Sequence, residues 1–446
     1  MNLNNIKSIL FLGIGGIGMS ALAKYFMAKN ISVYGYDRTP SDMTNTLSEM
    51  GAKISFVDDE NLAKNVYDLV IYTPAMPKDS FLLNHYKQSE TPLMKRSQAL
   101  GLITQANFTI AVSGSHGKTT VSSMIAFLLR ECGVDCSAFL GGVSVNFNSN
   151  YVQGTSEVVV VEADEFDRSF LTLSPNIIVL TSIDTDHLDI YGTRENIVAS
   201  FQEFLDKLDE KGVLIHNEKV TDNIQIKGDI KVYGFSEGDY LAQNVSIFPT
   251  YSTFQLNENP EVFKLNYNGR HNIENALAAI SVGKTLGLDI NKMVVAIDKF
   301  KGIKRRFELI YQDEKVIFID DYAHHPAEIE ALLSSVKEIF PSKQILSIFQ
   351  PHLYSRTKDL CVDFAKSLDL SDDVILLPLY PARELPIEGV NSYIISDKMK
   401  TKVEVVEKAD LIKSIKKRNF DVVLTIGAGD ISQCILDIKN SLNEKD

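Results

Sequence analysis

Residues Phe108–Thr120 read FTIAVSGSHGKTT, a short apolar run that leads into a glycine-containing turn with one lysine. The run Phe108–Val112 is typical of a strand that is buried in a parallel sheet. The turn Gly114–Thr119 reads G-x-x-G-K-T and is followed by a helical pattern over Val121–Arg130. Such a turn between a strand and a helix binds phosphate oxygens through backbone N–H groups, a lysine and a hydroxyl. The stretch therefore predicts a nucleotide-phosphate site in an α/β domain.

This turn departs from the common P-loop consensus, because only two residues separate its glycines and Val112 stands where the consensus has its first glycine. We interpret it as a compact variant. The alternative is a glycine turn beside an exposed lysine. The candidate phosphate ligands are Gly114, Ser115, His116, Gly117, Lys118, Thr119 and Thr120.

A second glycine-rich turn lies near the N-terminus. Gly13–Gly18 reads GIGGIG and stands between the apolar run Ser8–Leu12 and a helical pattern over Met19–Lys29. A strand pattern, Ser32–Tyr36, then ends at Asp37, close to the spacing of an acidic ribose ligand. The pattern predicts a dinucleotide or diphosphate site; the alternative is a turn that only packs a helix on a strand. Its candidate ligands are Gly13, Gly15, Gly16, Ile17, Gly18 and Asp37.

The 446 residues contain three blocks, each of which opens with an apolar strand pattern that runs into glycine or acidic residues. The third begins with the apolar run Val316–Ile319, which is followed by Asp320 and Asp321. Short β-branched runs alternate with helical patterns, which predicts parallel sheets built from βαβ units. We therefore predict an α/β fold of three domains, at residues 1–106, 107–312 and 313–446. The first and the last domain are expected to be Rossmann-like, and the central one to be of the P-loop ATPase type.

The composition excludes some classes of protein. Hydrophobic residues make up 45% and charged residues 23% of the chain, as in ordinary globular proteins. The formal net charge of −13 disfavours nucleic acid and anionic membranes as partners. The four cysteines form no CxxC pair, which favours reduced thiols and a cytoplasmic location. The apolar stretch Ile9–Ala23 is too short to span a membrane, although a signal peptide is an alternative interpretation.

Acidic residues follow two later strand patterns. Glu162–Glu165 (EADE) comes after the apolar run Val158–Val161. A carboxylate at such a strand end, beside a phosphate-binding turn, is placed to hold Mg²⁺. The alternative is a solvated acidic loop. His187 stands among three acids after the run Ile177–Leu180, where a ligand role and a structural role are equally supported.

Amides and cations mark the second half of the chain. Asn272 and Asn275 share a helix face and could contact an adenine edge, or Asn272 could be a helix N-cap. Arg305 and Arg306 could hold phosphate charge, or could form a basic linker.

Two polar motifs of the third block lie where strand ends open into a ligand crevice. They are Asp320–Pro326 (DDYAHHP) and Gln350–Arg356 (QPHLYSR). The paired histidines of the first motif could also bind zinc, although no thiol or third ligand is apparent.

Taken in order, these motifs resemble those of the Mur ligases over essentially the whole chain. The matching segments are GIGGIGMSALA, GSHGKTT, EADEFDRSFL, DTDHLDIYGT, GRHNIENALAA, GIKRRFE, DDYAHHP, FQPHLYSRT, YPARELPI and GAGD. The chain departs from the family pattern at Leu353, where many members have arginine. It also lacks a secure equivalent, after His187, of the carbamylated lysine of several sister ligases, which puts a second Mg²⁺ site in doubt.

The resemblance implies an enzyme that uses ATP to join L-alanine to UDP-N-acetylmuramate through an acyl phosphate, for peptidoglycan precursor synthesis. It implies that Gly13–Gly18 binds the UDP-sugar rather than NAD, and that Lys118 contacts the phosphates of ATP. The implied Mg²⁺ ligands, direct or through water, are Thr119, Glu162 and His187. The implied adenine contacts are Asn272 and Asn275.

In the third domain, the resemblance implies that Arg306 and Asp321 contact ATP. His325 and Arg356 would face the amino acid and the acyl phosphate, and His325 is our candidate for the base that accepts the amine proton. Lys118, His325 and Arg356 are therefore the candidate catalytic residues. The expected partners are these small substrates alone, without nucleic acid or membrane, for a monomer or homodimer.

Three other functions remain open. A nicotinamide oxidoreductase would use Gly13–Gly18 and Asp37, but it has no need of the second phosphate-binding turn. A P-loop regulatory protein would bind nucleotide without ligase chemistry. A murein-recycling ligase would add a whole tripeptide to the same UDP-sugar, but the run Asp186–Gly192 (DHLDIYG) looks more like that of the alanine-adding enzymes.

We predict that Glu162→Ala or His187→Ala weakens the Mg²⁺ dependence of turnover, because each change removes a ligand that the resemblance assigns to the metal. Titration of ATP-dependent turnover with Mg²⁺ measures the effect. A titration curve that matches that of the unsubstituted chain would contradict the metal assignment.

Overall fold

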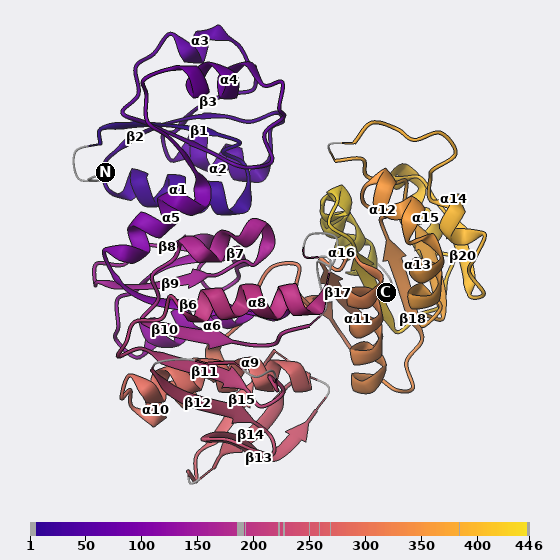
Figure 1. Cartoon of the computed structure of the whole chain (residues 1–446). Coiled ribbons are helices and arrows are strands. Elements are labelled where there is room, and N and C mark those ends of the chain that lie inside the picture. Colours follow the sequence, from indigo (N-terminus) through magenta and orange to yellow (C-terminus); the bar gives the residue numbers. More distant parts are fainter. Residues whose placement is uncertain are drawn as a thin grey trace. The chain divides into compact units, whose positions relative to one another are not determined.

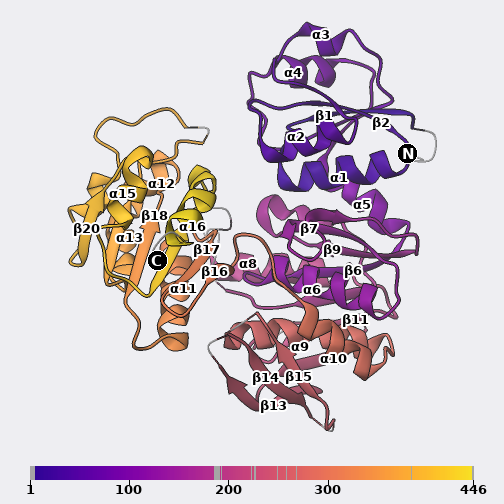
Figure 2. The same cartoon turned by 180° about the vertical axis from the view of Figure 1, so that it is seen from behind.

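The structure of the chain is a computed structural model that describes residues 6–184, 191, 193–221, 224–225, 228–248, 250–257, 259–267, 269–382 and 384–443. The chain divides into two compact units, Met1–Gly302 and Ile303–Asp446. The described residues form three sheets, of five, ten and six strands. Helices lie along these sheets, as Figure 1 and the opposite view in Figure 2 show. The predicted α/β class is confirmed.

The first sheet is parallel throughout and has the strand order β3-β2-β1-β4-β5. Its elements are β1 (Ser8–Leu12), α1 (Ile17–Ala28), β2 (Ser32–Tyr36), α2 (Asp42–Glu49), β3 (Lys53–Ser55), α3 (Glu60–Ala63), β4 (Leu69–Tyr72), α4 (Phe81–Gln88), β5 (Leu93–Lys95) and α5 (Arg96–Gln105). From β1 the chain builds the sheet outward on one side through β2 and β3, and then returns to the other side of β1 with β4 and β5. Ligands of parallel α/β sheets bind at such a point, beyond the carboxyl ends of the strands.

The central sheet has the order β15-β14-β13-β12-β11-β10-β6-β9-β7-β8. Its elements are β6 (Phe108–Ser113), α6 (Lys118–Glu131), β7 (Ser137–Ser144), β8 (Ser149–Val152), β9 (Val158–Glu162), the 3₁₀ helix η2 (Phe166–Thr172), β10 (Ile177–Leu180), α8 (Arg194–Leu205), β11 (Val213–Asn217), β12 (Asp229–Gly234), β13 (Tyr240–Ile247), β14 (Ser252–Leu256), β15 (Val262–Leu265), α9 (Arg270–Thr285) and α10 (Ile290–Lys299). Strand β6 pairs in parallel with both β10 and β9.

The third sheet forms the second unit and has the order β16-β17-β21-β18-β19-β20. Its elements are β16 (Glu308–Gln312), β17 (Ile317–Asp321), α11 (Pro326–Ile339), β18 (Ile345–Phe349), α12 (Tyr354–Asp359), α13 (Cys361–Leu368), β19 (Asp373–Leu376), α14 (Tyr393–Ser396), β20 (Lys402–Val405), η3 (Lys408–Asp410), α15 (Leu411–Ile415), β21 (Val422–Ile426), η4 (Asp430–Cys434) and α16 (Ile435–Asn443). All strands except β16 pair in parallel.

The apolar runs of the sequence form the interior strands of the sheets. The residues of β10, β18 and β21 are buried along their whole length, as expected of strands that helices cover on both faces. The stretch Ile9–Ala23 forms most of β1, a strand of the first sheet, and the first half of α1, which packs on that sheet. These runs bury alternate residues against opposite faces, so the first and the third sheet each have a core on both sides.

Strand β16 was not expected from the sequence. Its residues ELIYQ mix apolar and polar side chains and are half-buried or exposed, so they lack the continuous buried apolar run of a central strand. It pairs antiparallel with β17 at the edge of the third sheet. Its residues therefore belong to the third sheet, although they lie within the expected central domain, which ends at residue 312. The domain boundaries at residues 106 and 312 stay predictions.

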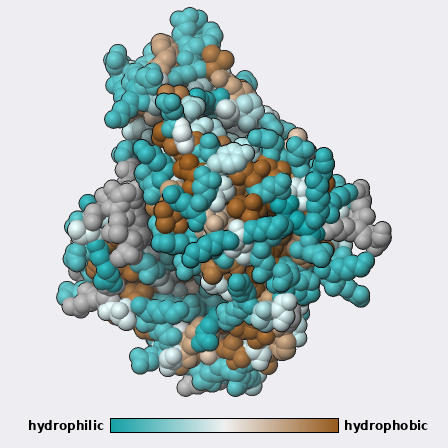
Figure 3. Space-filling model, turned by 90° about the vertical axis from the view of Figure 1, so that its right-hand side faces the viewer, coloured by the Kyte–Doolittle hydropathy of each residue, from teal (hydrophilic) through white to brown (hydrophobic). Residues whose placement is uncertain are grey.

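Hydrophilic residues cover most of the face that Figure 3 shows, with smaller hydrophobic areas between them. Scattered apolar side chains are normal on the surface of a folded protein. Within the described part of the chain, no helix has the length and apolar character needed to cross a membrane.

A buried polar cluster joins the first and central sheets inside the first unit. Lys24 of α1 donates through Nζ to Asn150 Oδ1 of β8, at 2.8 Å. Asn150 Nδ2 donates to the Ile17 carbonyl oxygen at 2.6 Å and to Ser20 Oγ at 2.9 Å. Asn150 is fully buried, and burial lowers the pKa of Lys24. Because Ile17 begins α1, an amide of the central domain holds the end of the N-terminal glycine-rich turn.

Apolar packing reinforces this junction. The ring of Tyr25 on α1 lies 5.5 Å from that of Phe139 on β7, and Phe139 lies 5.2 Å from Tyr151 on β8, measured between centroids. One cluster of buried apolar residues extends from Phe11 of the first sheet to Val161 of the central sheet. The two sheets therefore share a core.

We predict that Asn150→Ala lowers the free energy of unfolding by about 1–3 kcal/mol, because it removes two hydrogen bonds and leaves the buried Lys24 ammonium without its amide acceptor. Urea unfolding measures the loss. Gln88→Ala, at the exposed end of α4, is the control and should change stability by less than about 0.5 kcal/mol. Equal effects of the two substitutions would contradict the prediction.

Candidate functional site

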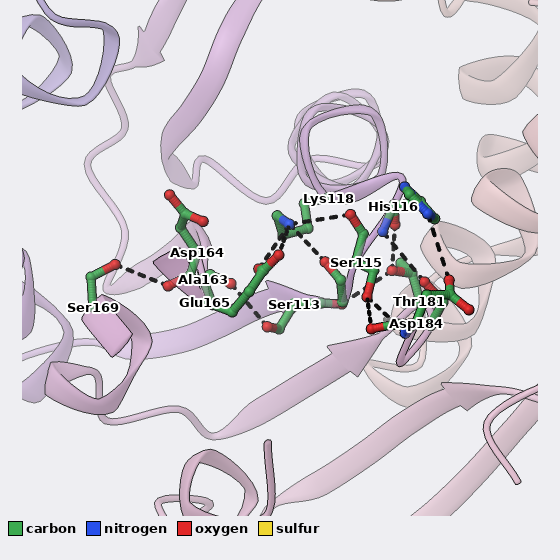
Figure 4. A network of polar contacts seen from close by, with 12 residues as sticks. Ser113, Ser115, His116, Lys118, Ala163, Asp164, Glu165, Ser169, Thr181 and Asp184 are labelled. Atoms are coloured by element: carbon green, nitrogen blue, oxygen red, sulfur yellow. Dashed lines mark hydrogen bonds and ion pairs between the residues drawn. The ribbon is translucent and has the colours of Figure 1, made fainter. Parts of the chain in front are cut away.

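Three loops meet at the carboxyl edge of the central sheet because β6 lies between β10 and β9. Val112 is in register with Glu162 on β9, and Ser113 with Leu180 on β10. The turn after β6 therefore lies between the acidic turn after β9 and the segment after β10. Figure 4 shows the polar contacts that join them.

The glycines of the predicted phosphate-binding turn are required by its backbone. Gly114 has φ +130°, and a Cβ atom there would lie 2.1 Å from Thr181 Oγ1. Gly117 has φ +80°, and a Cβ atom there would lie 2.8 Å from Asn275 Oδ1. A side chain at either position would be strained and would collide with its neighbour. The turn then leads directly into α6, whose first N–H groups have no partner within the helix.

The segment after β10 holds the turn in place (Figure 4). The Ser115 N–H donates to the Ser182 carbonyl oxygen at 3.2 Å, and the Asp184 N–H donates to Ser115 Oγ at 2.8 Å. Thr181 Oγ1 donates to the His116 carbonyl oxygen at 2.5 Å. The His116 side chain itself is exposed and lies 3.7 Å from Asp184, measured from Nε2 to Oδ2. His116 thus contributes to the turn mainly through its backbone.

Lys118 is folded back onto its own turn. Its Nζ donates to the Gly114 carbonyl oxygen at 2.7 Å and to Glu165 Oε1 at 2.8 Å. Glu165 is only 3% exposed. Burial lowers the pKa of Lys118, but the charges of Glu165 and Asp164 raise it more strongly, so that the pKa lies above its ordinary value. The ammonium group is therefore charged at neutral pH and is positioned at the phosphate-binding turn.

Glu162 is the last residue of β9, and Thr119 lies in the first turn of α6; both elements lie next to the turn that carries Lys118. The Glu162 carboxylate accepts a hydrogen bond from the Gly141 N–H at 3.0 Å, and a Cβ atom on Gly141 would lie 2.4 Å from it. Thr119 is buried in the first turn of α6. In the described residues, no group of three or more His, Cys, Asp or Glu side chains is arranged to hold a metal. His187, the third predicted ligand, lies outside the described residues.

The two predicted adenine contacts lie beside the same turn. α9 packs on α6, and Asn275 Nδ2 donates to Asn272 Oδ1 at 2.9 Å. The oxygen of the Asn275 amide is the atom that approaches Gly117. The helix begins after Gly269, so Asn272 lies in its first turn and the N-cap interpretation is wrong.

The N-terminal turn is shaped by close backbone approaches. Gly13 has φ +85°, and a Cβ atom there would lie 2.4 Å from Thr73 Cγ2. The Asp37 carboxylate accepts a hydrogen bond from the Gly15 N–H at 2.7 Å. Asp37 therefore holds the turn from the end of β2. Gly16 is the N-cap of α1, and Ile17 and Gly18 begin the helix.

In the second unit, two neighbouring carboxylates stand at the end of β17. Asp320 is fully buried, accepts a hydrogen bond from Thr425 Oγ1 at 2.6 Å and lies 3.4 Å from Arg305 Nε. The Asp321 carboxylate accepts hydrogen bonds from the N–H groups of Phe307 and Ala323. Burial raises the pKa of Asp321 to about 6, because it outweighs these bonds and the charge of Arg306.

The two arginines before β16 have different surroundings. Arg305 pairs with Asp320 and donates to the carbonyl oxygens of Gly427 and Gly429, so it holds its own domain together. Both guanidinium groups lie over the ring of Tyr322, that of Arg305 at 5.1 Å and that of Arg306 at 5.5 Å from its centroid, but Arg305 is also held by the contacts above. Of the two, Arg306 fits the predicted phosphate contact better.

The predicted amino-acid residues lie near the start of α11 and α12. The carboxylate of Glu328 accepts hydrogen bonds from the N–H groups of His324 and His325, and the His325 side chain is exposed. Burial lowers the pKa of His324, and the charge of Arg356 acts in the same direction. Arg356 Nη1 is buried without a hydrogen-bond partner among the described residues. Such a group is suited to an anionic ligand.

Leu353 has an unusual backbone for a residue with a side chain. Its φ is +71°, and its N–H donates to the Tyr380 carbonyl oxygen at 3.0 Å. Positive φ in a branched residue is strained and is found mainly at functional sites. The position that departs from the family pattern is therefore also a strained point directly before α12.

Sequence reasoning assigned no separate role to three residues of these sites. Glu165 was included only as one of several acids, yet it is the partner of Lys118. Gly141 and Asn150 carry no motif, because their roles depend on contacts with Glu162 and Ile17 from distant parts of the chain.

A P-loop domain, preceded and followed in the sequence by Rossmann-like domains, defines a class of three-domain nucleotide-binding proteins. Three family models match the chain. Residues 8–108 match the Mur ligase family, catalytic domain; residues 112–283 match the Mur ligase middle domain; and residues 305–429 match the Mur ligase, glutamate ligase domain. The chain belongs to the Mur ligase family, which confirms the resemblance seen in the sequence.

Individual relatives agree over the full length. The chain is 46% identical to the UDP-N-acetylmuramate–L-alanine ligase of Flavobacterium psychrophilum, covering 100% of both chains. It is 42% identical to the enzyme of that name from Porphyromonas gingivalis, covering 98% of this chain and 99% of the relative. The crystal structure of the UDP-N-acetylmuramate–alanine ligase MurC from Thermotoga maritima matches with a TM-score of 0.84 and 29% identity, covering 98% of this chain and 100% of that one.

We predict that Lys118→Ala reduces turnover to below about 1% and leaves the fold intact. Turnover is lost because the substitution removes the Lys118 ammonium, the only permanently charged cation at this turn among the described residues, which would otherwise offset the charge of the ATP phosphates. The fold should survive because burial already raises the pKa of Glu165, so that this carboxyl can take up a proton in place of its ion pair. Turnover and circular dichroism measure the two effects. Retention of more than a few per cent of activity would remove Lys118 from the chemistry.

Proposed function

We propose that the chain joins L-alanine to UDP-N-acetylmuramate with ATP, and that it releases ADP and phosphate. The observation that carries this proposal is the full-length similarity to ligases of that name, at 46% identity. The geometry supports it independently, because a lysine and carboxylates surround a phosphate-binding turn at one sheet edge. A nicotinamide oxidoreductase has no use for that turn.

The first step requires two anions to approach each other. A carboxylate is a poor acyl donor because oxide is a poor leaving group, so the lactyl carboxylate attacks the γ-phosphorus of ATP and forms an acyl phosphate. Lys118 offsets the negative charge that gathers on the transferred phosphoryl group. The carboxylate oxygen forms the new P–O bond while the bond to ADP breaks.

The residues beside the turn fit Mg²⁺. This ion keeps several waters and binds through one or two protein ligands together with substrate phosphates, so it does not need a cluster of protein side chains. The Thr119 hydroxyl and the Glu162 carboxylate would hold it, together with His187. Bound Mg²⁺ supplies further neutralisation of phosphate charge. The adenine would lie against Asn272 and Asn275, beside Gly117.

In the second step, the amine of L-alanine attacks the acyl carbon. The tetrahedral intermediate collapses and the phosphate leaves, while the amine gives up a proton. Arg356 is proposed to bind the carboxylate of alanine, because its buried Nη1 has no other partner among the described residues. The exposed ring of His325 is proposed as the base. Arg306 and Asp321 complete the proposed ATP contacts.

The N-terminal turn Gly13–Gly18 is proposed to bind the diphosphate of the UDP-sugar. The substrates are soluble, so we propose that the enzyme acts in the cytoplasm, without nucleic acid or membrane, as a monomer or homodimer. Exclusion of water during the reaction would protect the acyl phosphate from hydrolysis.

We predict that purified protein with ATP, Mg²⁺ and UDP-N-acetylmuramate releases ADP only when L-alanine is added. L-Ala-γ-D-Glu-diaminopimelate, added in a parallel reaction, should give no turnover. A coupled assay of ADP release measures both. Turnover with the tripeptide alone would make the chain a recycling ligase, and turnover with neither would overturn the ligase proposal.

A further inference from the structure

Arg96 reaches the N-terminal glycine-rich turn from another element of the same sheet. It is the first residue of α5 and follows directly after β5. β5 pairs in parallel with β4, and β4 with β1. The carboxyl ends of the three strands therefore lie along one edge. The turn leaves β1 at that edge, and Arg96 leaves β5 there.

The guanidinium of Arg96 lies against the backbone of Gly18. A Cβ atom added to Gly18 would stand 2.8 Å from Arg96 Nη1 and 3.1 Å from Arg96 Cδ. Any side chain at position 18 would displace the arginine. Because Gly18 has no side chain, Arg96 has room to contact the turn, and the chain can enter α1 at the same point.

On its other side, Arg96 lines a small pocket together with residues of the central domain. Glu162, Asp164 and Ser169 line the same pocket. Arg96 therefore lies between the N-terminal turn and the acidic turn after β9. Both belong to the first unit, in which the two sheets share a core.

The charge of Arg96 has no fixed partner in the described part of the chain. Its side chain is half-buried, and no hydrogen bond or ion pair of its guanidinium occurs among the described residues. A guanidinium that is partly removed from water gains most from an anion that accepts two parallel hydrogen bonds. A diphosphate offers such oxygen pairs.

We propose that Arg96 binds the diphosphate of the UDP-sugar at its contact with Gly18. The inference rests on the proposed function, which supplies this substrate. Because Arg96 also lines the pocket at Glu162, its contact with the diphosphate directs the sugar toward the phosphate-binding turn of the central domain. Arg96 is thus a substrate-binding residue that no motif of the sequence marks.

The test compares uridine with UDP on the full chain, because only UDP carries the group that Arg96 is proposed to bind. Calorimetry gives the ratio of their dissociation constants for the unsubstituted chain, Arg96→Gln and Arg96→Lys. In Arg96→Gln we expect the affinity for UDP to fall about 10- to 100-fold, while the affinity for uridine is unchanged. Arg96→Lys should recover part of the loss. Lys87→Gln, an exposed lysine of α4, is the matched control and should change neither affinity.

Further ligands separate the other possible outcomes. Loss of affinity for UDP-N-acetylmuramate alone, with UDP and UDP-N-acetylglucosamine unaffected, would place the guanidinium on the lactyl carboxylate and overturn the diphosphate assignment. Equal loss for uridine and UDP would mean a structural role and would also overturn it. An unsubstituted chain that binds none of the uridine ligands would overturn the proposed function, and this inference with it.

Discussion

Strand β6 pairs in parallel with β9 on one side and β10 on the other, and this pairing positions the turn that carries Lys118, the acidic turn after β9 and the segment after β10. Parallel strands end at the same edge, so three loops far apart in the sequence meet there. The phosphate-binding turn can then take its support from Ser182 and Asp184, while its lysine meets Glu165. A different strand order would separate these groups.

Buried charges in both units are compensated locally. Lys118 is paired with Glu165 in the first unit, and Arg305 is paired with Asp320 in the second. An unpaired buried charge would be costly, so these pairs constrain the loops that carry them. Arg96 and Arg356 differ from these pairs, because their guanidinium groups have unfilled hydrogen-bonding capacity among the described residues. Both are therefore suited to anionic groups of substrates.

Much of the fold and part of the site could be predicted from the sequence, because they depend on local patterns. Continuous apolar runs located β1, β6, β9 and β10, and the glycine turns located the ends of two of them. Strand β16 was missed because a half-exposed edge strand carries no such run. The roles of Glu165, Asn150 and Arg96 were missed because each arises from a partner distant in the sequence, and one sequence without its fold does not show such contacts.

The sequence by itself determined the α/β class and the family, and it predicted the phosphate-binding turn around Lys118, since short-range periodicity and ordered motifs are sufficient for these. The tertiary structure alone decided which side chains face those turns. Strand order placed Glu165 on Lys118, and the packing of α1 on β7 and β8 placed Asn150 on the end of the N-terminal turn. The physical reason is that turn geometry is encoded in a few adjacent residues, whereas hydrogen bonds and ion pairs across the core exist only once the sheets have formed.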